Sequence, residues 1–122
     1  MSVKAVCIGL LLAALGLWFK SDVLLAITAR QRGAAMARID WARGHRELKM
    51  MGLVYATRPA YAALLRDRYR THVNEVAGCV VSGPFGDYVE GYNLVVAERL
   101  RAEYGSDVVS ELAREVEERA TE

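Results

Sequence analysis

The chain has 122 residues, 53% hydrophobic and 25% charged, so it is too apolar to be disordered and long enough for one small core. A net charge of +1 excludes a uniformly basic or acidic protein, and two cysteines exclude a disulfide framework. The near-neutral total hides an asymmetry. Residues 20–72 hold eleven Lys or Arg against four acidic residues, whereas residues 98–122 hold four Arg against eight acidic residues.

The first feature along the chain is an apolar run from Ala5 to Phe19, with Lys4 before it and Lys20 after it. A helix of this length measures about 22 Å, against about 30 Å for the hydrocarbon core of a bilayer. Lysine side chains that reach the headgroups compensate for part of that difference. We therefore interpret residues 1–22 as an uncleaved single-pass transmembrane helix. A cleaved signal peptide is the alternative, because it has a cationic start and an apolar region of similar length.

Small residues recur every fourth position within this run, at Ala5, Gly9 and Ala13. That spacing places them on one helix face, where a second transmembrane helix can approach closely. We expect this face to pack against a helix of another membrane protein. The distribution of Lys and Arg does not decide which side of the membrane the rest of the chain occupies.

The basic segment, residues 23–58, follows the apolar run. Its arginines favour contact with anionic lipid headgroups, although they could also be ordinary solvated side chains. Alternating spacings of three and four predict one continuous helix, which we expect to pack within its own chain because a glycine interrupts its short apolar face. The face consists of Ala34, Ala37, Trp41, Gly44, Leu48, Met51 and Tyr55.

Residues 59–122 are predicted to form a small helical domain. Pro59 is suited to the first turn of a helix. The next stretch, residues 74–86, is apolar in its centre and rich in glycine, which favours a buried loop or a lone strand over a helix. The face expected for the helix that begins near Pro59 consists of Tyr61, Leu64, Leu65, Tyr69, His72 and Val73.

Two further helices are predicted in this domain. Asp87, followed by Glu90, forms a variant of the capping box at a helix start, and Gly105 is suited to the helix end. Ser106 or Asp107 is expected to cap a last helix. Its apolar stripe is Val109, Leu112, Ala113 and Val116, and its solvent face has the pairs Arg114–Glu118 and Glu115–Arg119.

The sequence nominates no catalytic residue, metal site or cofactor. His45 and His72 lack the spacing of a helical zinc site. Residues 83–86 resemble a phosphate-binding loop but lack the Lys-Ser/Thr pair that follows such a loop. The basic residues match no motif for nucleic-acid recognition, so no nucleic acid is expected as a partner.

A partner groove is the remaining candidate site. It comprises an aromatic and polar group beside the apolar loop, namely Cys79, Tyr88, Tyr92 and Asn93. The alternative is ordinary core packing, in which the tyrosine hydroxyls reach solvent.

Together these features predict an all-α protein in which a single transmembrane helix precedes about four helices and one apolar loop. The first functional hypothesis is a non-enzymatic, membrane-anchored accessory or assembly subunit of a larger membrane protein complex. The alternative is an exported or anchored helical binding domain that uses the loop around Cys79 and the helix start at residues 88–93. An enzyme ranks third, because no residue nominates a mechanism.

Overall fold

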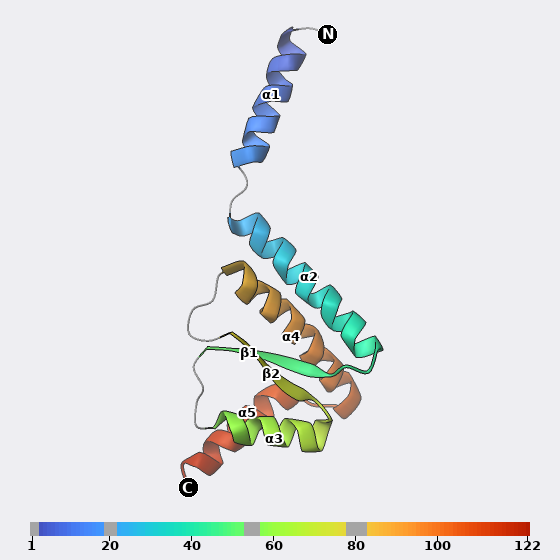
Figure 1. The fold of residues 1–122 in the computed structure, drawn as a ribbon, viewed down its shortest axis with the longest axis vertical. Coiled ribbons are helices and arrows are strands. Elements are labelled where there is room, and N and C mark those ends of the chain that lie inside the picture. The colour runs from blue at the N-terminus through green and yellow to red at the C-terminus, as the bar shows by residue number, and fades with distance from the viewer. Residues whose placement is uncertain (1–2, 19–21, 53–56, 78–82) are drawn as a thin grey trace.

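The computed structural model describes residues 3–18, 22–52, 57–77 and 83–122, with the backbone alone at residues 17, 18, 22–27 and 77. The mostly helical character that the sequence predicts is confirmed: within the described residues, five helices hold 77% of the positions, and two short strands accompany them. In chain order the elements are α1 (Val3–Trp18), α2 (Asp22–Ala42), β1 (Glu47–Met51), α3 (Arg58–Tyr69), β2 (His72–Ala77), α4 (Gly83–Tyr104) and α5 (Val108–Ala120) (Figure 1).

The two strands form a parallel pair that α3 connects (Figure 1). Parallel strands run in the same direction, so a crossover element has to return the chain to the start of the sheet. The register pairs Glu47 with His72 and Met50 with Glu75, and a bulge follows at Met51. The buried loop or lone strand expected within residues 74–86 is wrong in part. An extended segment is present as β2, but it pairs with β1 and its residues 74–76 are exposed or half-buried, and residues 83–86 already belong to α4.

The continuous helix predicted from Ala34 to Tyr55 is wrong. The helix α2 ends at Ala42, Leu48 and Met51 lie in β1, and Tyr55 lies outside the described residues. The physical reason is Gly44, whose φ of +78° places it in the left-handed region that favours glycine at a helix C-terminus.

Hydrogen bonds at the end of α2 form a Schellman motif around this glycine. The His45 amide donates to the carbonyl oxygen of Asp40 at 2.9 Å, and the Gly44 amide donates to that of Trp41 at 3.0 Å. The chain therefore turns sharply, and His45 is held next to the last turn of α2.

The helices α2 and α4 lie side by side, with their backbones in close approach (Figure 1). A Cβ added to Gly33 would lie 1.9 Å from the Tyr88 carbonyl oxygen, and one added to Gly91 would lie 2.1 Å from that of Arg30. Such distances are far inside van der Waals contact, so only glycine fits at either position. With Ala29 and Ala37, Gly33 forms a small-residue stripe along α2 whose three members are all buried.

The core lies among α2, α3, α4, α5 and β1. Residues 23–58 and 59–122 contribute side chains to the same core, because Ala37 and Leu48 pack in one cluster with residues of α3, α4 and α5. These include Tyr61, Leu65, Tyr92, Leu100, Val108, Leu112 and Val116.

The C-terminal helices follow the predicted signals closely. Gly105, with a φ of +78°, follows α4, and the Asp107 side chain accepts a hydrogen bond from the Ser110 amide at the start of α5. The ion pairs Arg114–Glu118 and Glu115–Arg119 both form. Two details differ: α4 begins at Gly83 rather than Asp87, and Ala113 is exposed.

The helix α1 extends away from the other elements (Figure 1). Each of its side chains from Val3 to Gly16 is exposed, including large apolar ones such as Leu10 at 66% and Leu12 at 64%. Within the described residues, no helix combines the length and the apolar character that crossing a membrane requires.

Candidate functional site

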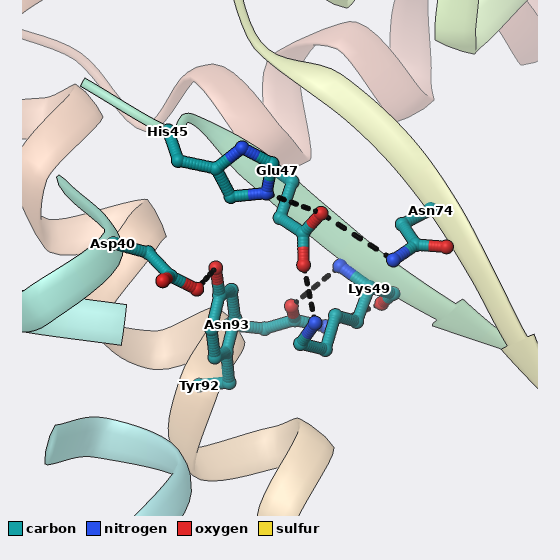
Figure 2. Close-up of polar contacts among 7 residues, drawn as sticks. All are labelled: Asp40, His45, Glu47, Lys49, Asn74, Tyr92 and Asn93. Carbon is teal, nitrogen blue, oxygen red and sulfur yellow. Dashed lines mark hydrogen bonds and ion pairs between the residues drawn. The ribbon is translucent and has the colours of Figure 1, made fainter. Parts of the chain in front are cut away.

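A polar cluster gathers where the end of α2, the start of the sheet and the middle of α4 meet. Figure 2 shows its side chains turned toward one another. The Schellman motif and the first residues of β1 supply one side, and α4 supplies the other. The polar cluster consists of Asp40, His45, Glu47, Lys49, Asn74, Tyr92 and Asn93.

Glu47 is the buried acid at the centre of this cluster. Its Oε2 lies 2.9 Å from His45 Nε2 and accepts a hydrogen bond from Asn74 Nδ2 at 3.3 Å, while Oε1 accepts one from Lys49 Nζ. Burial alone would raise the pKa of Glu47, but the hydrogen bonds with Lys49 and His45 outweigh it and hold that pKa below its ordinary value. Glu47 is therefore a carboxylate at neutral pH.

Asp40 is the second acid of the cluster and is bound to α4. The Tyr92 hydroxyl donates to its Oδ2 at 2.7 Å. Burial raises the pKa of Tyr92 far above its ordinary value, and the hydrogen bond to Asp40 adds to the shift. Tyr92 therefore acts as a fixed hydrogen-bond donor that connects α4 to the last turn of α2.

Lys49 and Asn93 connect β1 to α4. The Asn93 side chain accepts from the Lys49 amide at 2.9 Å and donates to the Lys49 carbonyl oxygen at 2.6 Å. The Lys49 ammonium lies 4.3 Å from the centre of the Tyr92 ring, within cation–π distance. These contacts satisfy the backbone of an edge strand and hold the sheet in place against the helix.

Three side chains of the cluster carry atoms that bind metal ions. One ligand atom from each of Asp40, His45 and Glu47 can be chosen so that all three lie within 4.8 Å of one another. Sequence reasoning missed this group because it looked for histidine pairs within a helix. The signal that was present is Gly44, since a glycine suited to end a helix places the residues on either side of it close together.

A pocket of 640 Å³ opens beside the sheet and is lined by residues of β1, α3, α4 and α5. This volume lies within the range of small-molecule sites. Tyr61 lines it and donates to the Val109 carbonyl oxygen at 3.3 Å, and burial, aided by the charge of Asp107, raises the pKa of Tyr61 to about 12. Its apolar lining includes Leu48, Met50, Val89, Leu94, Ala97 and Val116.

The residues predicted for a partner groove do not share one environment. Tyr92 is completely buried in the core, whereas Tyr88 is half-buried near the crossing of α2 and α4. Asn93 lines the pocket while its amide pairs with Lys49. Cys79 lies outside the described residues. The groove itself stays a prediction.

Ion pairs within the protein neutralise part of the charge asymmetry of the sequence. Arginines of residues 20–72 form ion pairs with acids of β2, α4 and α5: Arg30 with Glu90, Arg46 with Glu103, Arg58 with Glu75 and Arg68 with Glu115. Exposed arginines with no ion pair among the described residues include Arg32, Arg38 and Arg43. The arginines of residues 20–72 thus complement acidic residues of β2, α4 and α5 across the fold.

Comparisons of the chain with protein families, with curated protein sequences and with solved structures find no match.

Proposed function

We propose that this protein is a non-enzymatic, membrane-associated accessory subunit, which α1 attaches to a membrane or to the apolar helices of a membrane complex. The observation that carries this proposal is the exposure of α1. Its side chains from Val3 to Gly16 are exposed, and Lys4 is the charged residue among them. An apolar surface of this extent is rare on a soluble monomer and marks an interface with lipid or protein.

The length of α1 is the reason to expect a protein neighbour as well as lipid. Sixteen residues of helix span about 24 Å, so α1 is shorter than an average hydrocarbon core of about 30 Å. A short apolar helix adapts to this mismatch by local thinning of the bilayer or by association with other helices. The face formed by Ala5, Gly9 and Ala13 provides the surface for such association.

Membrane association is tested with two charges in the centre of α1. Arginine in the middle of a membrane helix costs about 2.5 to 3.5 kcal/mol, so Leu10→Arg with Leu11→Arg should move the full chain from the membrane pellet to the supernatant. The matched control places two arginines at exposed positions of α4 and α5, Ala102→Arg with Ser110→Arg, and should stay in the pellet. Equal sedimentation of the two variants would refute the role of α1.

The accessory role is tested with two neighbouring alanines. Ala13 belongs to the small-residue face of α1 and Ala14 does not, so the same enlargement at each position isolates the face. Ala13→Leu should abolish co-purification with larger membrane proteins in mild detergent, whereas Ala14→Leu should preserve it. A chain that runs alone as a monomer in its native extract contradicts the accessory role while leaving membrane association intact.

A second candidate function is a small binding domain, and the pocket favours it. Its walls are mainly apolar, with Asn93 among the polar residues that line it, so an apolar small molecule fits it better than a charged one. Filling the pocket with Ala113→Trp should reduce binding of an apolar fluorescent probe, while Ala102→Trp on the outer face of α4 should not. Equal probe binding by both variants would exclude the pocket.

A further inference from the structure

We propose that Asp40, His45 and Glu47 form a binding site for one divalent transition-metal cation such as Zn²⁺. This goes beyond the proposed membrane role and does not depend on it. The donor set is one imidazole nitrogen with two carboxylate oxygens, a combination that suits zinc and its first-row neighbours better than the harder Mg²⁺ or Ca²⁺.

The distances within the group fit coordination of a single ion. The 2.9 Å between His45 Nε2 and Glu47 Oε2 corresponds to an angle of about 90° at an ion placed about 2.1 Å from each atom. Opposite ligands at that bond length are about 4.2 Å apart, close to the 4.8 Å within which all three ligand atoms lie. Small side-chain shifts therefore suffice to bring in Asp40.

The surroundings fix the two carboxylates and direct one oxygen of Glu47 toward His45. Lys49 donates to Oε1 of Glu47 and Tyr92 donates to Oδ2 of Asp40, so both carboxylates are held in place by a hydrogen-bond donor before an ion binds. Hydrogen bonds to the second oxygen of a ligating carboxylate orient it and tune its affinity. Asn74, which donates to Oε2 at 3.3 Å, supports the same orientation.

The site is anchored in the fold and also accessible from solvent. Glu47 is buried, whereas the His45 side chain is 61% exposed and lies at the outer edge of the cluster. The Schellman motif fixes the backbone of His45 against Asp40, so two of the ligands are brought together before any ion arrives. Three protein ligands leave open positions for water, as in zinc sites that are not purely structural.

A change at Lys49 distinguishes a metal site from a structural hydrogen-bond network. Its ammonium is bound to Glu47, so it competes electrostatically with a cation that uses the same carboxylate. Removing that charge should therefore strengthen metal binding, whereas removing a ligand should weaken it. A merely structural network predicts no dependence on metal at all.

The experiment titrates the metal-free full chain, in mild detergent, with Zn²⁺ and measures binding by calorimetry. The absorption spectrum with Co²⁺ in place of Zn²⁺ is the spectroscopic check. The expected result is one ion per chain. Among the ligands, His45→Ala is the variant of choice because its side chain is exposed, and it should weaken binding at least about ten-fold. Glu47→Gln should weaken binding further, provided that circular dichroism shows it folded.

Two further variants complete the test. Lys49→Met, which keeps an apolar stem over Tyr92, should tighten binding about ten-fold. His72→Ala, which removes the other histidine, should leave the affinity unchanged within about two-fold. The proposal is overturned if the full chain shows no saturable 1:1 binding below about 100 µM Zn²⁺. It is equally overturned if His45→Ala binds as tightly as the parent or if Lys49→Met binds more weakly.

Discussion

The helices α1 and α2 carry small residues at the same spacing, but α2 has a partner helix within the chain. On α2, a Cβ at Gly33 would collide with the backbone of α4 at 1.9 Å. On α1, a Cβ at Gly9 would meet no described atom within 4 Å. Small residues every fourth position therefore identify a surface suited to close helix approach, but they do not reveal where the partner comes from. The stripes are Ala29, Gly33 and Ala37 on α2 and Ala5, Gly9 and Ala13 on α1.

The flanks of the two stripes differ in a way that explains their different environments. Next to Gly33, Arg30 forms an ion pair with Glu90 at 2.7 Å, so polar side chains fix α4 beside α2 in water. Next to Gly9 lie Ile8 and Leu10, both exposed and apolar. Such a stripe can be covered only where its flanks are also removed from water. The polar flanks of α2 suit a contact within the chain, whereas the apolar flanks of α1 suit the contact with lipid or another protein that we propose.

The largest expected loss of stability comes from shortening a buried apolar side chain of the folded domain. An exposed apolar side chain of α1 serves as the control. Leu100 is completely buried, so Leu100→Ala should lower the free energy of unfolding by about 4 kcal/mol, through lost burial and a residual cavity. Leu10→Ala on exposed α1 should leave the unfolding of the folded domain unchanged. Urea denaturation followed by circular dichroism measures both. A similar loss in both variants would place α1 in the cooperative core, against the exposure described above.

The glycines of the two stripes provide the next test. Gly33→Ala should destabilise the protein by about 3 kcal/mol, because the helices must separate to admit a methyl group. Gly9→Ala should leave the unfolding of the domain unaffected, since its Cβ would meet open space among the described atoms. Thermal unfolding of the two variants side by side is the measurement. Equal melting temperatures would contradict the close approach of α2 and α4.

The hydrogen bond at the end of the α2–α4 contact should have a smaller effect. Tyr92→Phe removes the donor to Asp40 and keeps the ring, so we expect a loss of about 2 kcal/mol. Tyr88→Phe, on the same helix but half-buried, is the matched control and should lose less. Chemical denaturation of both variants measures the two losses of stability. A smaller loss for Tyr92→Phe than for the control would show that the bond to Asp40 adds no stability.

The smallest effect concerns the ion pair between Arg68 of α3 and Glu115 of the last helix. The hydrogen bond from Arg68 holds the pKa of Glu115 below its ordinary value of 4.5, so this contribution to stability is present above that value and is lost as the pH falls. Glu115→Gln should therefore slightly reduce the fall in melting temperature on acidification. Glu117→Gln, on the same helix, should leave that fall unchanged. The melting temperature measured from pH 7 down to pH 3 tests it. Identical acid profiles of the parent and Glu115→Gln would contradict it.

The end of α4 and the last helix were predictable because their signals are local. The cap at Asp107, the glycine at Gly105 and the pairs on α5 each involve residues four or fewer positions apart, and the structure contains all of them. The strand β1 was not predictable in this way. Leu48 and Met51 continue a helical spacing from Trp41, and only the positive φ of Gly44 ends the helix before them.

The polar cluster was even less accessible from sequence, because its members come from segments far apart in the chain. Tyr92 reaches Asp40 across 52 positions, and Asn74 reaches Glu47 across 27. The parallel pairing of β1 with β2 brings Asn74 into place, and no local pattern indicates such a pairing. The same limitation applies to the arginines, whose partners lie on β2, α4 and α5.

The contact between α2 and α4 can form only some time after α2 has been synthesised. Arg30 and Glu90 are 60 positions apart, so at about 5 to 20 residues per second α2 leaves the ribosome roughly 3 to 12 s before its partner is complete. During that interval both small-residue stripes are uncovered on neighbouring helices. In the membrane role that we propose, the apolar flanks of α1 would bind a membrane during this interval, whereas the charged flanks of α2 keep it in water until α4 is complete.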